Sequence, residues 1–169
     1  MSGGEAPLRY IGAPEPYEAF FWQSGADGRL RLQHCDGCDR FHHPPQPVCP
    51  YCHSTELDPK PVVGSGTIAT YTVNHQPFMP GFDPPYAIAF VEIDEDPTIR
   101  LCTNLVDIDP DDVHIGLRVE VTFEQTDEAW IPLFRPSSAA PVVPDPRPKL
   151  RWSAGSQPAD QRNFSQGGG

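Results

Sequence analysis

The sequence predicts a mainly β fold in which a short N-terminal helix and a small cysteine-rich segment precede a compact β-barrel. Three observations support this prediction. The first is a pair of C-x-x-C motifs between residues 35 and 52. The second is a series of five short segments, between residues 67 and 135, that are rich in β-branched and aromatic residues. The third is the high proline content, 22 of 169 residues, which disfavours long helices.

Residues 1–25 are expected to form an irregular lead-in followed by a short helix. Pro16 suits the first turn of a helix, and Gly25 suits the position just past its end. Four aromatic side chains lie between them: Tyr17, Phe20, Phe21 and Trp22. They have two interpretations, because they either pack in the core of this chain or form a docking surface for a partner protein.

Residues 26–60 are expected to form a zinc ribbon. The candidate ligands stand as two C-x-x-C pairs with ten residues between the pairs: Cys35, Cys38, Cys49 and Cys52. Each pair supplies two thiolates from a tight turn, and tetrahedral zinc prefers such a set of four ligands. Four thiolates close the coordination shell, so we expect one structural Zn²⁺ per chain and no open catalytic position.

The backbone of this ribbon is expected to be mostly irregular. Asp27-Gly28 is a turn signal, and residues 29–33 alternate as a half-buried strand does. Prolines at positions 44, 45 and 47 predict no regular structure between the cysteine pairs. Four histidines flank the cysteines and are interpreted as loop residues rather than as a second metal site: His34, His42, His43 and His53.

Residues 61–136 are expected to form a five-stranded barrel of the OB type, because five short strands in so short a segment are typical of that barrel. The strands are expected at residues 67–73, 86–93, 99–106, 118–124 and 130–135. Pro132 has no backbone N–H and therefore places the last strand at a sheet edge. Cys102 lies in mid-strand without an activating neighbour, and we predict a buried core cysteine rather than a nucleophile.

The body of the chain is strongly acidic. The formal net charge is −11, and residues 1–136 carry 8 basic and 21 acidic side chains. Such a body repels phosphate backbones, so we expect no nucleic-acid partner. No apolar run approaches the roughly 20 residues that span a bilayer, and no signal-peptide pattern is present. We therefore expect no membrane association and a cytoplasmic location, where paired cysteines bind metal.

Residues 137–169 differ from the body in composition and charge. They are rich in proline, serine, glycine and glutamine, and carry four basic and two acidic residues. This composition predicts a C-terminal tail that is either disordered or docked on a partner. Leu150-Arg151-Trp152 is an apolar anchor within it.

Several short motifs follow one another in a recognisable order along residues 16–136. In the first half they are Phe21-Trp22, Gly28-Arg29-Leu30, Cys35-Asp36-Gly37-Cys38, Phe41, Pro44-Pro45 and Val48-Cys49-Pro50-Tyr51-Cys52. In the second half they are Gly66-Thr67-Ile68, Thr72-Val73-Asn74-His75, Pro85-Tyr86-Ala87-Ile88-Ala89, Asn104-Leu105-Val106-Asp107, Asp111-Asp112-Val113-His114-Ile115-Gly116 and Val119-Glu120-Val121. The chain resembles the DUF35 family of acyl-CoA-associated proteins, in which a rubredoxin-like zinc ribbon precedes an OB-fold.

The resemblance implies a non-catalytic subunit that binds and stabilises a thiolase-superfamily enzyme. Such enzymes include thiolases, hydroxymethylglutaryl-CoA synthases and the lipid-transfer-protein-like aldolases of steroid side-chain breakdown. Other family members are fused to, or work beside, hotdog-fold enoyl-CoA hydratases. We therefore expect a hetero-oligomer with acyl-CoA at a shared site and no catalytic residue in this chain. Arg40, with Phe41 and His75, is the candidate ligand edge.

Two other interpretations remain open. Zinc ribbons and OB-folds both occur in proteins that bind single-stranded nucleic acid. The acidic body and the shortage of basic residues among the barrel aromatics argue against that function. An independent acyl-CoA hydrolase is the third interpretation, and the sequence shows no nucleophile–base pair for it.

Overall fold

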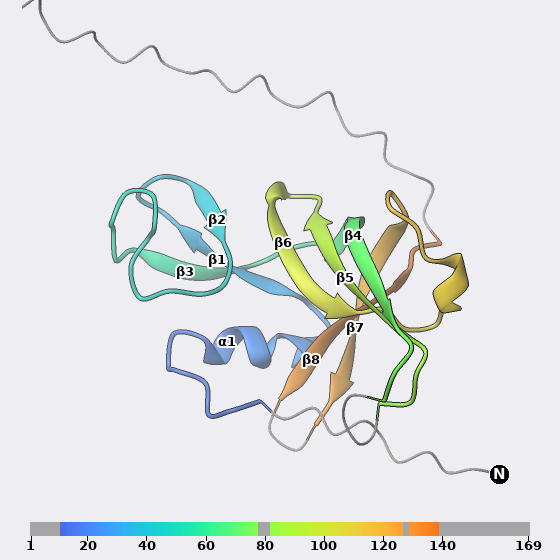
Figure 1. Cartoon of the computed structure of the whole chain (residues 1–169). Coiled ribbons are helices and arrows are strands. Elements are labelled where there is room, and N and C mark those ends of the chain that lie inside the picture. Colours follow the sequence, from blue (N-terminus) through green and yellow to red (C-terminus); the bar gives the residue numbers. More distant parts are fainter. Residues whose placement is uncertain (1–10, 78–81, 127–128, 139–169) are drawn as a thin grey trace, which may run out of the picture.

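The computed structural model describes residues 11–77, 82–126 and 129–138, which form two antiparallel sheets (Figure 1). The strands are β1 (Arg31–Cys35), β2 (Arg40–His42), β3 (Leu57–Pro61), β4 (Ser65–Asn74), β5 (Tyr86–Ile93), β6 (Asp96–Asn104), β7 (Arg118–Gln125) and β8 (Trp130–Pro136). The smaller sheet has the order β2-β1-β3 and the larger one the order β6-β5-β4-β7-β8. The predicted mainly β fold is confirmed, and almost all of the predicted tail lies outside the described residues.

The N-terminal helix is shorter than the predicted span 16–25. Helix α1 (Ala19–Trp22) is followed by a 3-10 turn, η1 (Ser24–Asp27). The Ser24 hydroxyl donates to the carbonyl oxygens of Phe21 at 2.8 Å and Phe20 at 3.0 Å, and so satisfies the end of the helix. Gly25 packs so tightly that an added Cβ would lie 2.6 Å from Phe123 Cδ1. A side chain at this position would therefore clash with Phe123 and Trp130. No helix in the described part of the chain is long and apolar enough to cross a bilayer.

The ribbon contains more regular structure than the sequence predicted. Strand β1 continues to Cys35, and β2 and β3 pair with its two edges. A strand, β2, can form between the cysteine pairs because it ends at His42, before the first of the three prolines. β3 tolerates two prolines because it is an edge strand. The proline-rich loop is held by the buried amide of Gln33, which donates to Gln46 O at 3.0 Å and accepts from Gln46 N at 2.7 Å.

All five strands predicted for the barrel are present. β6 is displaced toward the N-terminus relative to the predicted span 99–106, because Val106 leaves the strand and donates to Phe134 O at 2.9 Å. β8 lies at a sheet edge, as Pro132 predicted. The other edge strand, β6, runs parallel to β8, and an isolated bridge joins Leu105 to Phe134. The result is a half-barrel in which the two edge strands approach each other at one end.

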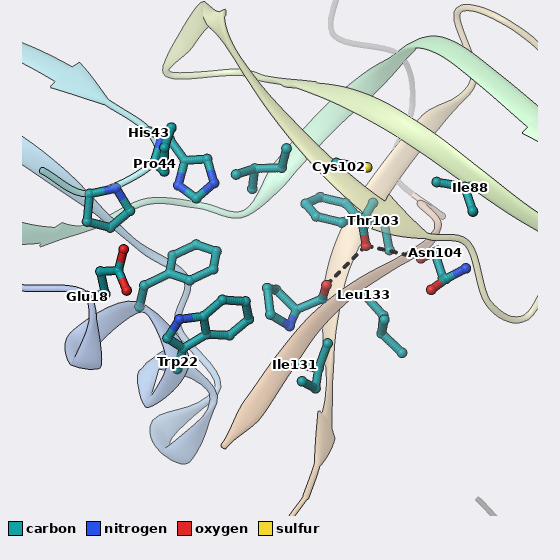
Figure 2. Close-up of a pocket in the computed structure, with 15 residues that line it drawn as sticks. Glu18, Trp22, His43, Pro44, Ile88, Cys102, Thr103, Asn104, Ile131 and Leu133 are labelled. Carbon is teal, nitrogen blue, oxygen red and sulfur yellow. Dashed lines mark hydrogen bonds between the residues drawn. The ribbon is translucent and has the colours of Figure 1, made fainter. Parts of the chain in front are cut away.

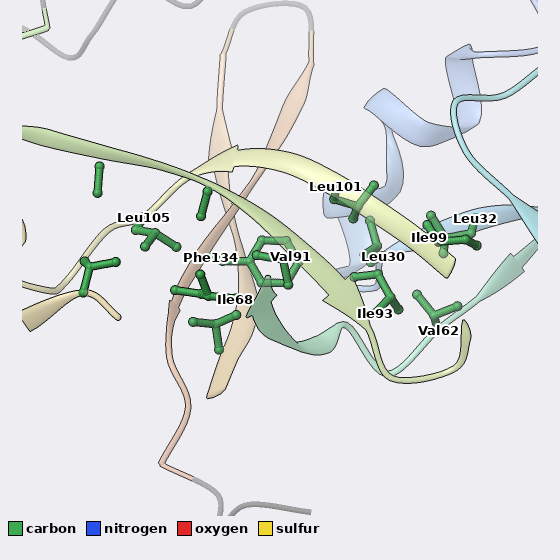
Figure 3. Close-up of a cluster of buried hydrophobic side chains, with 14 of the residues drawn as sticks. Leu30, Leu32, Val62, Ile68, Val91, Ile93, Ile99, Leu101, Leu105 and Phe134 are labelled. Atoms are coloured by element: carbon green, nitrogen blue, oxygen red, sulfur yellow. The ribbon is translucent and has the colours of Figure 1, made fainter. Parts of the chain in front are cut away.

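One hydrophobic core connects the two sheets. Leu30 and Leu32, from the start of the ribbon, lie beside Ile93 and Ile99 of the barrel (Figure 3). Phe134 is fully buried near the middle of the barrel part of the same cluster. The ribbon therefore packs on the barrel through apolar side chains at its base, whereas its tip carries the cysteines.

The prediction that Cys102 is buried is wrong. Leu101 and Thr103 point inward and are 3% and 7% exposed. Because successive side chains of a strand point to opposite faces, Cys102 points outward and is exposed. It pairs across the sheet with Phe90, which is also exposed.

Candidate metal centre and the adjacent cavity

The four predicted ligands lie together at the tip of the ribbon. Cys35 ends β1, Cys38 lies in the turn to β2, and Cys49 and Cys52 belong to the second turn. Their sulfur atoms all lie within 4.8 Å of one another. The Cys35–Cys52 and Cys38–Cys49 sulfur separations are 3.5 and 3.7 Å. A tetrahedral site with Zn–S bonds of about 2.3 Å needs sulfur separations of about 3.8 Å, so the set fits one zinc ion.

The two cysteine turns have the same backbone construction. Asp39 N donates to Cys35 O at 2.9 Å, and His53 N donates to Cys49 O at 3.0 Å. Asp39 and His53 are each four residues after the first cysteine of their pair, and both are left-handed, with φ of 55° and 60°. Two equivalent turns therefore present two sulfur atoms each, which is the arrangement that C-x-x-C spacing predicted.

The surroundings of the cysteine thiols shift their pKa values, and these values determine how many protons zinc must displace. Burial raises the pKa of Cys38 to about 12 and also raises that of Cys35. Burial acts in the same direction on Cys49, but the backbone N–H groups of Cys52 and Tyr51 lower the pKa of Cys49 to about 6. Zinc binding therefore releases protons, at least from Cys35 and Cys38, and metal affinity falls with decreasing pH.

Polar contacts support the first turn from outside. The His34 ring, which is buried, lies 3.0 Å from Asp36 Oδ1 through Nδ1 and 3.1 Å from Asp39 Oδ1 through Nε2. Lys60 of β3 donates to Asp36 at 2.7 Å. Among the described residues, the four cysteines are the one group of three or more ligands close enough to hold a metal. His34 lies on β1 and His42 ends β2, so these two histidines are strand residues and not the loop residues that the sequence predicted.

The aromatic residues of the N-terminal segment mostly pack on this chain. Phe21 is 5% exposed and belongs to the core, and Phe20 and Trp22 pack against that core. Tyr17 is half-buried. Partner binding by these four residues stays a prediction, with Tyr17, Phe20 and Trp22 retaining exposed surface.

The candidate ligand edge is divided between two parts of the molecule. Arg40 and Phe41 lie on β2, where the Arg40 guanidinium is 4.9 Å from the centre of the Tyr51 ring and Phe41 packs edge-on against His34. His75 is exposed and follows the end of β4. No described hydrogen bond, ion pair or ring contact joins His75 to the other two, so their shared role stays a prediction.

A cavity of about 430 Å³ lies between α1, the proline-rich loop and the edge strands β6 and β8 (Figure 2). Phe21, Trp22, His43 and Pro44 line one side, and residues 101–104 and 131–134 line the other. Burial lowers the pKa of His43 to about 4, and His43 Nδ1 has no partner among the described residues. Sequence reasoning missed this cavity, because its walls come from four segments far apart in the chain.

The cavity does not assemble a nucleophile–base pair. Cys102 and His43 both line it, but Figure 2 shows them on opposite sides, and no described hydrogen bond joins them. The Thr103 hydroxyl donates to the backbone oxygens of Pro132 at 3.0 Å and Asn104 at 3.2 Å. The Thr103 hydroxyl is therefore occupied by structural contacts, and no described hydrogen bond joins the Cys102 thiol to a base.

The comparisons with known proteins match both parts of the chain. The ChsH2 rubredoxin-like zinc ribbon domain matches residues 22–58, and the ChsH2 C-terminal OB-fold domain matches residues 60–124. A "DUF35 domain-containing scaffold protein" of Methanocaldococcus jannaschii is 34% identical over 96 residues, which are 56% of this chain and 67% of that protein.

Two further relatives carry hydratase names. A "Probable enoyl-CoA hydratase alpha subunit" of Thermomonospora curvata is 40% identical over 120 residues, 70% of this chain and 37% of that protein. A "3-oxo-4,17-pregnadiene-20-carboxyl-CoA hydratase alpha subunit" of Mycobacterium tuberculosis is 36% identical over 106 residues, 62% of this chain and 33% of that protein. The chain thus spans about a third of the length of these two subunits.

A solved structure matches nearly the whole described part. It is a chain of an "Ltp2-ChsH2(DUF35) aldolase", with a TM-score of 0.68 and 38% identity over 75% of this chain and 98% of that chain. With the four-cysteine cluster and the OB-type half-barrel already located, the chain belongs to the DUF35 family, in the form that joins a rubredoxin-like zinc ribbon to an OB-fold.

Proposed function

We propose that this chain is a non-catalytic accessory subunit that binds and stabilises a thiolase-superfamily enzyme acting on acyl-CoA thioesters. One observation carries the proposal: the likeness to the "Ltp2-ChsH2(DUF35) aldolase" chain extends over 98% of that chain at 38% identity. A chain that shares the whole domain pair with a subunit of a named enzyme complex is expected to share its mode of assembly.

Two observations support a role without chemistry of its own. The archaeal relative is named a scaffold protein. In addition, four thiolates leave zinc no open position, and the cavity places Cys102 apart from His43. The chain therefore contributes structure and contact surface, and the reacting groups belong to the partner.

The tip of the ribbon is the part best suited to meet the partner. Val48 and Tyr51 are 39% and 50% exposed there, and Arg40 stacks on the Tyr51 ring. An exposed aromatic with a stacked arginine is typical of the centre of a protein interface. Arg40 is also the cation we expect to face a phosphate of a CoA ester held by the partner, since the rest of the body is acidic.

The substrate class is expected to be a steroid-derived acyl-CoA. The support is the mycobacterial relative, whose name contains a pregnadiene carboxyl-CoA. The two hydratase names favour a second candidate partner, an enoyl-CoA hydratase subunit, because those relatives contain a region like this chain within a much longer protein. Both candidates place the chain beside an enzyme of acyl-CoA breakdown.

Co-expression with each candidate partner tests the proposal. We expect the thiolase-type enzyme to co-elute with the chain in size-exclusion chromatography with mass detection, and to lose activity when the chain is omitted. Tyr51→Ala should weaken the complex at least tenfold, whereas Ile115→Ala, which truncates a side chain 66% exposed in the loop before β7, should not. A monomeric chain beside a fully active thiolase-type enzyme would reject the proposal, and co-elution with the hydratase alone would favour the second candidate.

A further inference from the structure

The two cysteine turns share a backbone construction but differ in the side chains around it. Three positions can be compared: the residue before the first cysteine of the pair, the residue after it, and the residue after the second cysteine. In the first turn these residues are His34, Asp36 and Asp39. In the second turn they are Val48, Pro50 and His53. The first set can form side-chain hydrogen bonds, and two members of the second set cannot.

One buried ring joins the polar residues of the first turn. The His34 side chain is 6% exposed, and its Nδ1 and Nε2 lie 3.0 Å from Asp36 Oδ1 and 3.1 Å from Asp39 Oδ1. Because these aspartates follow the first and the second cysteine, the ring bridges both ends of the turn. Lys60 of β3 donates to the same Asp36 oxygen at 2.7 Å, and Asp36 N donates to Glu56 O at 3.1 Å. The first turn is therefore tied across its own span and to the segment that begins β3.

The second turn has no such bridge among the described residues. No described hydrogen bond or ion pair involves the side chain of His53, which is exposed. Its backbone bonds run from Cys49 N to Ser54 O at 2.9 Å and from His53 N to Cys49 O at 3.0 Å, so they stay within the turn. The first turn lies between β1 and β2, whereas the second lies in the irregular segment between β2 and β3. Cys52 is exposed, whereas Cys38, at the corresponding place in the first turn, is half-buried.

These differences make opening of the first turn the more costly of two local events. Each part of a fold opens with its own free energy, which depends on the contacts that must break. Opening the first turn separates a buried ring from two carboxylates and disturbs the end of β1. Opening the second turn breaks backbone bonds between residues 49 and 54. Contacts behind metal ligands matter for the metal itself, since their removal commonly weakens binding by about 10- to 100-fold.

We propose that His34 is a positioning residue that holds the first cysteine turn in its zinc-binding shape, and that the second turn is the half of the site that opens. Cys52 is then the first of the four sulfurs to separate from the ion. The inference does not depend on the function proposed above. It gives a role to one of the four histidines around the cysteines, and it makes the two halves of a four-thiolate site unequal.

Amide hydrogen exchange in the zinc-loaded chain tests this inference, because the two turns offer equivalent probes. The Asp39 amide donates to Cys35 O in the first turn, and the His53 amide donates to Cys49 O in the second. Relative to the rate of each residue in an unstructured peptide, we expect the His53 amide to exchange at least tenfold faster. Equal protection of the two amides would overturn the inference.

His34→Phe keeps an aromatic ring at this position and removes both ring nitrogens. We expect exchange of the Asp39 amide to rise to within threefold of that of the His53 amide, while the His53 amide and the amides of β5 keep their rates. A merely destabilising substitution would raise the rates of both turns together, and that result would overturn the inference.

A matched pair of substitutions covers the case in which His34→Phe binds no zinc. Asp39→Asn and His53→Asn place the same residue at equivalent left-handed positions, which asparagine tolerates. We expect Asp39→Asn to speed exchange in the first turn at least threefold, because it weakens the contact with the His34 ring. His53→Asn should leave both turns unchanged. Equal effects of the two substitutions would contradict the role of His34.

Alkylation with N-ethylmaleimide measures the order in which the sulfurs separate. The chain carries Cys102→Ser to remove the exposed cysteine outside the cluster, and elemental analysis first verifies one zinc per chain. We expect peptide mapping to show Cys52 labelled at least tenfold faster than Cys38. Adding His34→Phe should raise the rate at Cys38 at least fivefold and leave that at Cys52 unchanged. If Cys38 is labelled first, or if the ratio of the two rates is the same in both chains, His34 does not set the order and the inference is overturned.

Discussion

The ribbon and the barrel are held together by different forces. In the ribbon, four cysteine sulfurs within 4.8 Å of one another and a set of polar contacts around His34 and Gln33 fix the backbone. In the barrel, a cluster of buried aliphatic side chains around Phe134 does so. The core also includes Leu30 and Leu32 at the base of the ribbon, so the two regions differ at their far ends and share one interior at their junction.

This difference teaches how a small segment remains folded. The ribbon tip has few large apolar side chains to bury, and a bound ion replaces the core that it lacks. The barrel buries enough apolar surface to need no ion. Losing the metal should therefore affect one region first, and losing a core side chain should affect the other.

The largest expected effect is the loss of zinc in a Cys49→Ser variant. Structural zinc contributes about 10–16 kcal/mol in ribbon-sized sites, so the ribbon tip should unfold while the barrel strands remain. Elemental analysis should fall from one zinc per chain toward zero, and amides of β1 and β2 should lose exchange protection. Cys102→Ser, which changes an exposed cysteine outside the cluster, is the control and should keep its zinc. Unchanged zinc content in Cys49→Ser would refute the assignment of this ligand.

The second effect is a core cavity made by Phe134→Ala. This side chain is fully buried, and its truncation should reduce the free energy of unfolding by about 3–5 kcal/mol. Phe90→Ala removes a phenyl ring that is 43% exposed, and we expect a change of about 0.5 kcal/mol or less. Denaturant titration of both variants measures the difference. Zinc content should be one per chain in each, and a Phe134→Ala chain that lost its zinc at neutral pH would show that the two regions are not separately held.

The third effect depends on pH and concerns His43. Burial, with a smaller contribution from His42, lowers its pKa to about 4 from an ordinary value of 6.5. The unfolded chain therefore binds a proton between these values that the folded chain excludes, so stability falls as pH decreases from 6.5 to 4. His43→Leu should remove up to about 3 kcal/mol of this dependence. Denaturant titration at several pH values in that range measures the free energy of unfolding, with exposed His75→Leu as the control. If this free energy changes with pH to the same extent in the wild-type chain and both variants, the pKa shift of His43 is contradicted.

The smallest expected effect is that of the Asp94 ion pair. Asp94 accepts two hydrogen bonds from Arg118, at 2.6 and 2.5 Å, and one from Ser65 at 2.6 Å, which together lower its pKa. The stabilisation is present above the ordinary pKa of an aspartate and is lost as pH falls through the lowered value. Asp94→Asn should reduce the free energy of unfolding by about 1 kcal/mol at neutral pH. Asp58→Asn on exposed β3 should have no measurable effect, and a similar loss in both variants would show that the pair contributes nothing specific.

Local sequence patterns predicted most of the elements. The two C-x-x-C pairs identified the four clustered cysteines, and alternation identified all five barrel strands, with bounds within three residues. Pro132 predicted an edge strand correctly. The patterns failed where pairing partners decide the outcome. β2 and β3 are short and irregular in sequence, and they are strands because β1 offers both of its edges.

Cys102 shows why a local pattern has limits. Its place in mid-strand without an activating neighbour indicated burial, but the direction of a strand side chain depends on the register with β5, which the sequence does not state. The cavity is a stronger case, since its walls come from α1, the proline-rich loop and two strands more than 25 residues apart. No motif marks such a place.

The sequence by itself determined which four cysteines cluster, the mainly β character and the order of ribbon and barrel, because these depend on residue type and on spacing over a few positions. Only the tertiary structure decided that ribbon and barrel share a core, that Cys102 is exposed, and that the edges of β6 and β8 enclose a cavity with α1. The physical reason is that burial and pairing depend on segments distant in the chain, whose approach is decided by the packing of the whole fold.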